Sequence, residues 1–218
     1  MSTDQDRPAL PTALLRTRVV AVLRGDDPER VVQAGVVLHD AGVTCLEVAF
    51  TTPRATEAIS RLRELLPESA ALGAGTVLDA HEAGEARAAG ATFLVSPAPC
   101  LDVVEAGVRA GIPVLPGAFT PGEVLAAWRA GASAVKIFPA ASGGPGHVRD
   151  LRGPLPGIPF IPTGGIGVAD AAVYLDAGAV AVGLGSALTG RLDGQESDDV
   201  LRDRARALLD SLAAVSRG

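Results

Sequence analysis

Lysine is used once in this chain. Of the 19 basic residues only Lys136 is a lysine, and it lies between Val135 and Ile137 in the largely apolar run 132–139. A solvated charge is out of place there, whereas a primary amine forms an imine with a ketone, which a guanidinium does not. Burial also lowers the pKa of an ammonium group, so the neutral nucleophile is available nearer neutral pH. The lysine favours imine catalysis, with a buried structural ion pair or a surface charge as alternatives.

Glu47 is a carboxylate in a similar setting. It lies between Leu46 and Val48, and the side chains of a strand alternate between two faces. If Leu46 and Val48 face neighbouring helices, Glu47 faces the opposite side, and the same alternation puts Lys136 and Phe138 on one face. An amine with a carboxylate opposite can transfer protons beside an imine. A plain buried salt bridge is the alternative, which the cost of burying an isolated pair disfavours.

Two glycine-rich segments are suited to an anion. PTGGI occupies residues 162–166 and GLGSAL residues 183–188, each at the end of an apolar run. Glycines let backbone N–H groups approach phosphate oxygens, and the hydroxyls of Thr163 and Ser186 add donors. Because the net charge of −6 repels an anion, local dipoles must hold it. The two segments together predict a phosphate site, although either alone is a common turn.

The remaining polar residues predict no metal, nucleotide or flavin site. Arg24 ends the run 19–24 and either binds a carboxylate through its planar fork or is an ordinary charge at the rim. The histidines lie at no metal-ligand spacing and are expected at the surface, and three aspartates are expected to cap helices: His39, His81, His147, Asp26, Asp27 and Asp79.

A repeated Ala-Gly pair indicates the elements that position these residues. Five of the Ala-Gly pairs stand just before an apolar run, beginning at residues 41, 89, 110, 130 and 177, with spacings of 48, 21, 20 and 47. Glycine suits the left-handed end of a helix, so each pair marks a helix that leads into a strand. The two long spacings each hide one more strand, at 71–78 and 158–165. With the run 19–24 the sequence predicts eight strands.

Eight β/α units predict a closed (β/α)8 TIM barrel over about residues 18–195. An open doubly wound sheet is the alternative, but it usually carries GxGxxG after its first strand, and LRGDDP stands there instead. In the barrel Glu47 and Lys136 belong to strands on opposite walls, and the loops after strands 7 and 8 commonly bind phosphate.

The segments flanking the barrel are also expected to be ordered parts of one domain, residues 1–218. A short helix between about Pro8 and Arg18 is expected to cap the barrel floor, and about Ser197 to Arg217 to form a terminal amphipathic helix. The stretch 141–146, ASGGPG, is expected as a flexible loop over the pocket.

Composition limits the class of protein. Apolar residues make up 48% and charged residues 20%, so one sizeable core is expected. The acidic pI of about 5.1 argues against nucleic-acid and membrane-surface partners. No apolar run is long enough to span a bilayer and no signal peptide is recognised, so a cytoplasmic location is expected, with Cys45 and Cys100 as free thiols.

Eight motifs in this order resemble one enzyme family, the 2-keto-3-deoxy-6-phosphogluconate (KDPG) and 4-hydroxy-2-oxoglutarate (KHG) aldolases. The resemblance runs from about residue 12 to 190, through AVLRG, LEVAFTTP, GAGTVL, FLVSP, LPGAFTP, AVKIFPA, PTGGI and VGLGSAL. It implies a class I aldolase of the Entner–Doudoroff type of sugar-acid metabolism. Such an enzyme splits its substrate reversibly to pyruvate and glyceraldehyde 3-phosphate, needs no metal or other cofactor, and is typically a homotrimer.

The same resemblance implies a role for each matching residue. Lys136 would form the imine, and Glu47 would shuttle protons at the carbinolamine stage and at the carbon that is joined. The pyruvate end would be lined by Thr76 and Pro97, with Arg24 nearby and Phe138 packed against the site. The phosphate would be held by Thr163, Gly164, Gly165, Gly185 and Ser186.

One departure affects the choice of substrate. Several members of the family carry arginine shortly after the glutamate, in the stretch where this chain has Thr51 and Thr52. The galactonate-type substrate and 4-hydroxy-2-oxoglutarate therefore remain alternatives to the gluconate-type substrate. Two further hypotheses stay open: a phosphate-binding barrel isomerase or synthase without imine chemistry, and a non-catalytic binding barrel.

Overall fold

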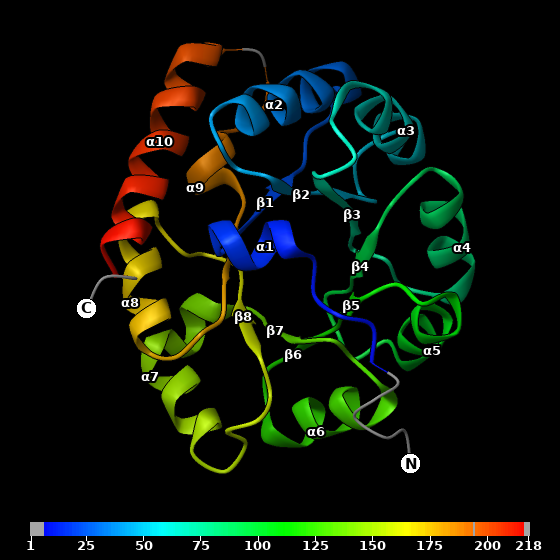
Figure 1. Cartoon of the computed structure of the whole chain (residues 1–218), viewed down its shortest axis with the longest axis vertical. Helices are drawn as coiled ribbons and strands as arrows, with labels where there is room; N and C mark the ends of the chain where they lie inside the picture. The colour runs from blue at the N-terminus through cyan, green and yellow to red at the C-terminus, as the bar shows by residue number, and fades with distance from the viewer. Residues whose placement is uncertain (1–6, 194, 216–218) are drawn as a thin grey trace.

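The computed structural model describes residues 7–193 and 195–215. Strands and helices alternate along the chain, and Figure 1 shows the strands at the centre with the helices around them. The strands are β1 Val19–Leu23, β2 Cys45–Ala49, β3 Ala71–Gly75, β4 Phe93–Val95, β5 Val114–Leu115, β6 Gly117–Ala118, β7 Val135–Ile137, β8 Phe160–Pro162 and β9 Val182–Leu184. All eight predicted strand positions are therefore occupied.

The helices follow the strands in sequence. They are α1 Thr12–Thr17, α2 Pro28–Asp40, α3 Ala55–Leu65, α4 Ala80–Ala88, α5 Leu101–Ala110, α6 Pro121–Ala130, α7 Ala140–Arg152, α8 Ala171–Asp176, α9 Ser186–Thr189 and α10 Asp198–Val215, with a 3-10 turn at Val168–Asp170. The expected terminal helix thus forms as α10, and its predicted end at Arg217 lies outside the described residues. No helix in the described ranges is long and apolar enough to cross a membrane.

The strands form an α/β fold with parallel pairing. Six strands pair in the order β5-β4-β3-β2-β1-β9 and three in the order β6-β7-β8. Pro116 separates β5 from β6, because proline has no N–H to donate to a ladder. Hydrogen bonds also cross between the two sheets, from Ser133 N to Val114 O at 3.0 Å and from Val180 N to Phe160 O at 3.0 Å. The two sheets are therefore hydrogen-bonded to each other on both sides.

Two apolar clusters lie on the two faces of the strands. The outer cluster contains Leu46 and Val48 together with apolar side chains of the helices, which confirms the predicted alternation in β2. The inner cluster takes side chains from every strand position and from α1: Val20, Cys45, Ala71, Phe93, Val95, Leu115, Ala134, Ile161, Ala181, Ala13 and Leu14. The expected N-terminal helix therefore packs against the amino ends of the strands, over a shorter range than predicted.

Local sequence signals explain where several helices begin. The side chain of Asp27 accepts a hydrogen bond from Glu29 N at 3.0 Å, and that of Asp79 accepts one from Glu82 N at 2.8 Å. Both predicted caps are confirmed. The two cysteines are free, as expected.

The stretch 141–146 corrects one expectation. It is not a loop over the pocket but part of α7, which bends at Gly144 with φ of 66°. Glycine takes this left-handed conformation at little cost, and Pro145 can then start the next helical turn because its missing N–H is not needed there. Gly144 therefore divides α7 into two helical segments, and the second starts at Pro145.

His147 corrects another expectation. Its ring is partly buried, stacks on Phe119 with ring centroids 4.4 Å apart, and has Nε2 2.8 Å from the Phe119 carbonyl oxygen. His39 is also largely shielded, with 18% of its side chain exposed, whereas His81 is exposed as expected. A backbone oxygen therefore lies within hydrogen-bonding distance of the His147 ring. The sequence pattern does not predict this contact.

Candidate active site

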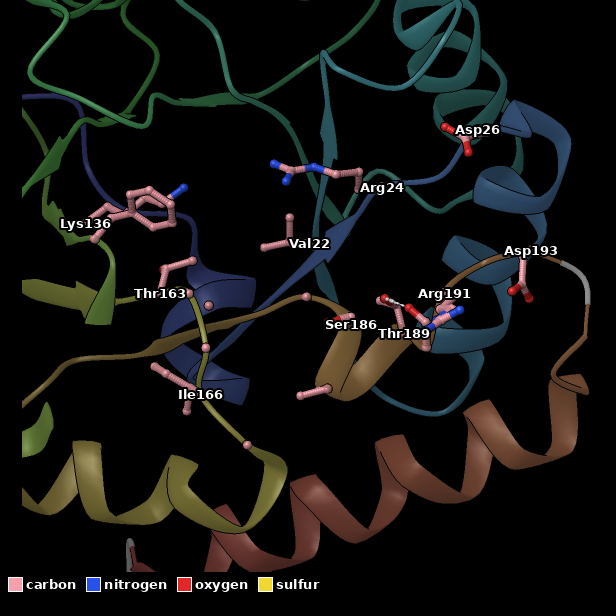
Figure 2. A pocket seen from close by; sticks show the side chains of 18 residues that line it. Val22, Arg24, Asp26, Lys136, Thr163, Ile166, Ser186, Thr189, Arg191 and Asp193 are labelled. Carbon is pink, nitrogen blue, oxygen red and sulfur yellow. Dashed lines mark hydrogen bonds between the residues drawn. The ribbon is translucent and has the colours of Figure 1, made fainter. Parts of the chain in front are cut away.

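A cleft of about 880 Å³ opens at the carboxyl ends of the strands. Figure 2 shows it from close by, with side chains from the ends of β1, β7, β8 and β9 pointing into it. Eight of the residues singled out by the sequence line it: Arg24, Lys136, Phe138, Thr163, Gly164, Gly165, Gly185 and Ser186. The topology therefore gathers residues that are far apart in the sequence at one end of the sheet.

Lys136 is buried in the middle of β7. Only 6% of it is exposed, and its Nζ lies 5.1 Å from the centre of the Phe138 ring, on the same face of the strand as predicted. Burial lowers the pKa of the amine, the charge of Glu47 raises it, and the charge of Arg24 lowers it. A surface lysine is therefore excluded, and the group has the environment of an amine that loses its proton more readily than usual.

Glu47 is even more deeply buried, with 2% exposed on β2. Burial raises the pKa of this carboxyl group, while the charges of Lys136 and Arg24 lower it. The neighbouring strand leaves room for it only because residue 75 is glycine, since a Cβ on Gly75 would lie 2.6 Å from Glu47 Oε1. The carboxyl group is thus held in a fixed place and keeps its proton more readily than an exposed glutamate.

Lys136 and Glu47 influence each other without forming an ion pair. Among residues 7–193 and 195–215 no hydrogen bond joins the two groups, and no ion pair within 4.0 Å does so. Each nevertheless shifts the pKa of the other through its charge. The lack of a direct contact argues against a structural salt bridge between the amine and the carboxyl group.

Arg24 belongs to the same group of charges. Its Nη2 donates to Thr76 Oγ1 at 3.2 Å, and its charge shifts the pKa of both Lys136 and Glu47. Thr76 is held at φ of 59°, a conformation that costs a non-glycine residue free energy and often marks a functional site. Thr76 does not line the cleft itself, but it fixes an arginine that does.

The two glycine-rich segments meet at the carboxyl ends of β8 and β9, where Thr163 bridges to Gly183. Gly164 and Gly165 have φ of 95° and 74°, and a Cβ on Gly164 would lie 2.8 Å from the Phe138 ring. A Cβ on Gly183 would collide with the side chain of Thr163, whose hydroxyl donates to Ile161 O at 3.2 Å. Glycine is therefore required for these backbone segments to approach one another, and their N–H groups come close to the cleft.

Pro97 packs beside the strand pair that carries Lys136. A Cβ on Gly117 would collide with the carbonyl group of Pro97, and Gly117 pairs in register with Lys136. Neither Pro97 nor Glu47 is among the residues that line the cleft. The sequence predicts both as site residues, and their roles stay predictions.

Several lining residues were missed by the sequence analysis. Asp26 was expected to cap a helix but lines the cleft, and Thr189, Arg191 and Asp193 follow the predicted phosphate segment directly. Charged residues just beyond a predicted binding loop were the available signal. Within the described ranges no group of three or more His, Cys, Asp or Glu side chains is arranged to hold a metal ion.

The whole arrangement has counterparts among known proteins. The family model "Aldolase: KDPG and KHG aldolase" matches residues 11–202. The chain belongs to the KDPG and KHG aldolase family. It is therefore an enzyme, an aldehyde-lyase, which removes the hypothesis of a non-catalytic binding barrel.

Three members of this aldolase family show how close the similarity is. The 2-dehydro-3-deoxy-phosphogluconate aldolase of Treponema pallidum is 39% identical over 75% of this chain and 78% of its own. The probable 2-dehydro-3-deoxy-6-phosphogalactonate aldolase of Rhizobium meliloti is 34% identical over 96% and 98%. The crystal structure of KDPG aldolase from Legionella pneumophila, with pyruvate captured as a covalent carbinolamine intermediate, superimposes with a TM-score of 0.78 at 28% identity over 94% and 97%.

Proposed function

We propose that this aldolase cleaves 2-keto-3-deoxy-6-phosphogluconate, or a closely related 2-keto-3-deoxy sugar acid, reversibly to pyruvate and glyceraldehyde 3-phosphate through an imine on Lys136. The observation that carries the proposal is the buried amine of Lys136, in a cleft that also receives the two glycine-rich segments. The Legionella enzyme, with pyruvate bound as a carbinolamine, supports the same chemistry.

Lys136 begins the reaction as a neutral amine. Its nitrogen attacks the C2 carbonyl carbon of the keto acid and gives a carbinolamine, which loses water to form the imine. The C3–C4 bond then breaks, its electron pair moves into the imine to give an enamine, and the C4 hydroxyl loses its proton as the aldehyde leaves. Protonation at C3 and hydrolysis release pyruvate and restore the amine.

Glu47 is proposed to move the protons. A carboxyl group with a raised pKa can give a proton to the departing water and take one from the C4 hydroxyl. The absence of a direct ion pair with Lys136 among the described residues leaves it free to do both. Arg24, with Thr76 behind it and Pro97 nearby, is proposed to hold the keto-acid carboxylate, and Phe138 to pack against the carbon chain.

The phosphate is proposed to lie at the glycine-rich end of the cleft. Thr163, Gly164 and Gly165 follow β8, and Gly185 and Ser186 follow β9, so their N–H and hydroxyl groups border the same space. The relatives include both gluconate-type and galactonate-type enzymes. Because Thr51 and Thr52 replace the arginine of several relatives, the substrate can be the gluconate-type acid, the galactonate-type acid or 4-hydroxy-2-oxoglutarate. The substrate screen below distinguishes these three.

The test compares the chain with its Lys136→Arg variant. We expect the unchanged protein to release pyruvate from 2-keto-3-deoxy-6-phosphogluconate and to gain the mass of one reduced pyruvyl group when pyruvate and borohydride are added. The variant keeps the charge but forms no imine, so both signals should disappear while its circular dichroism spectrum stays the same.

Two controls make that result decisive. Arg109→Lys puts a lysine on the exposed outer face of α5, where we expect no trapping with pyruvate. Turnover by the Lys136→Arg variant, or turnover without any trapped adduct, would favour an isomerase-like or synthase-like chemistry without an imine. The galactonate-type acid, the unphosphorylated acid and 4-hydroxy-2-oxoglutarate belong in the same pyruvate-release screen.

We also propose that residues 1–218 form one domain in which the two sheets close into a single eight-stranded barrel. The hydrogen bonds between the sheets and the bridge between Thr163 and Gly183 support closure. The family resemblance supports a homotrimer, and the composition and the free thiols support a cytoplasmic enzyme. Light scattering coupled to size exclusion measures the assembly.

A further inference from the structure

The cleft extends well past the groups needed for the reaction at the ketone. Figure 2 shows Lys136 on one side and Arg191, close to Ser186 and Thr189, on the other. Three side chains that line this cleft are basic: Lys136, Arg24 and Arg191. Because Lys136 and Arg24 serve the keto-acid end, Arg191 is the cation that remains for the opposite end.

The backbone that carries Arg191 is held firmly in place. Gly190 on one side has φ of 68°, and Leu192 on the other has φ of 53° and is only 3% exposed. Leu192 also packs against Gly25, since a Cβ on that glycine would lie 3.2 Å from Leu192 Cβ. A buried leucine in the left-handed conformation persists only where its surroundings fix it, so the root of the Arg191 side chain is fixed beside the cleft.

A network of ion pairs fixes the segment that follows. Arg204 pairs with Glu196 through both of its terminal nitrogens and donates to Leu188 O at 2.9 Å. Arg30 donates to Glu196 O at 3.0 Å and pairs with Asp198. Glu196 is thereby tied to α2 and α10, while Arg191 takes no part in the network.

Arg191 itself is exposed and available. Its guanidinium makes no hydrogen bond or ion pair with any other residue in the described ranges, although Asp26 and Asp193 line the same cleft. Those two carboxylates repel a phosphate group, which carries about −1.5 to −2 charges near neutral pH. The glycine-rich segments offer only dipoles, so a full positive charge is needed to offset the acidic rim.

We propose that Arg191 is a specificity-determining residue, which binds the distal phosphate of the substrate and makes this aldolase select phosphorylated over unphosphorylated keto-deoxy acids. This inference rests on the proposed function, because it takes the substrate to span the cleft from Lys136. Arg191 acts in binding and takes no part in the proton transfers. Without the charge of Arg191, the negative charges of Asp26 and Asp193 near the phosphate are no longer offset.

The test measures kcat/KM for 2-keto-3-deoxy-6-phosphogluconate and 2-keto-3-deoxygluconate. In Arg191→Gln we expect kcat/KM for the phosphorylated acid to fall roughly ten- to a hundred-fold, the range for a lost charge-assisted hydrogen bond. The value for the unphosphorylated acid should stay within about two-fold of the original. Arg191→Lys should recover part of the loss because it restores the charge without the planar fork.

Arg109→Gln is the matched control, because Arg109 is an exposed arginine of α5 outside the cleft. It should change neither constant. Equal changes for both substrates in Arg191→Gln, or none, would overturn the inference, and a lowered melting temperature with an unchanged substrate ratio would assign Arg191 a structural role.

A binding measurement separates this inference from the proposed function. Inorganic phosphate is titrated calorimetrically into the unchanged enzyme and into Arg191→Gln, and the affinity should be lower in the variant. If the unchanged enzyme releases no pyruvate from either acid, the proposed function fails. Phosphate binding that is equal in the two proteins contradicts the role of Arg191, whatever the outcome of the turnover assay.

Discussion

At the scale of single residues, Arg24 sets the balance between the two buried titrating groups. Its charge lowers the pKa of Lys136 and also that of Glu47, although burial is the largest influence on each. One arginine therefore favours the uncharged amine and the charged carboxylate together. That pair of forms is the one from which nucleophilic attack and proton abstraction can start.

Removing this charge should move the pH dependence of imine formation in a defined direction. Arg24→Met takes away a cation that lowers the pKa of Lys136, so at any given pH more of the amine is protonated. The rising limb of pyruvate trapping with cyanoborohydride, followed by intact mass, should shift to higher pH. Arg61→Met, on the outer face of α3, is the control. A limb that stays in place or shifts to lower pH contradicts the role given to Arg24.

The sequence predicts the chemistry of single residues well where a residue type is out of place. Lys136 and Glu47 both interrupt apolar strands, and strand alternation alone gives the face on which they lie. Asp26 and Arg191 carry no such signal, because they stand in polar loops where charges are ordinary. Only the tertiary packing of Leu192 against Gly25 brings these loops to the cleft.

At the scale of elements, α6 has the most complete start of any helix adjoining the cleft loops. Thr120 and Glu123 form a capping box, in which the Glu123 carboxylate accepts from Phe119 N at 2.9 Å and from Thr120 N at 2.7 Å. These hydrogen bonds lower the pKa of Glu123. The same contacts hold Phe119, on which His147 of α7 stacks, so one cap links two helices.

Loss of this cap should destabilise the protein measurably. Thr120→Ala removes the hydroxyl that receives the Glu123 N–H, and we expect the free energy of unfolding in urea to fall by about 1 kcal/mol. Thr51→Ala, which removes an exposed hydroxyl outside any cap, should change it by only a few tenths. Equal effects of the two substitutions would show that the capping box contributes nothing.

Elements with a strong period or a clear cap were predicted close to their true positions. The strands follow the Ala-Gly pairs, and α2 and α4 begin at the expected caps. The failure is α7, because glycine and proline in ASGGPG suggest a loop when each is considered alone. In the fold the chain leaves the helical conformation only at Gly144, and a second helical segment follows, in which Val148 and Leu151 are buried.

At the scale of the whole molecule, the inner apolar cluster joins all parts of the chain. It takes side chains from every strand position and from α1, so the first helix and the last strand share one core. The Ala-Gly spacing predicts the number of strands, but not which hydrogen bonds join β8 to β9 or that Pro116 divides one strand. Those details depend on local backbone geometry, which periodicity does not encode.

A shared core should make unfolding a single event. Trp128 belongs to α6, and its ring lies against Arg7. In urea at fixed protein concentration, its fluorescence and the circular dichroism at 222 nm should follow the same transition. The two probes report different regions, because helices surround the strands while Trp128 lies in one place. Transitions with separate midpoints would contradict a single domain.

The burial of Lys136 also has a practical use in protein chemistry. With no other lysine in the sequence, succinimidyl esters and similar acylating reagents find, apart from the α-amino terminus, only an amine inside the cleft. A bulky dye should therefore leave the outer surface unlabelled, whereas a small keto-acid probe should mark one nitrogen per chain. The mass added per chain by such a probe would therefore count the functional active sites in a preparation.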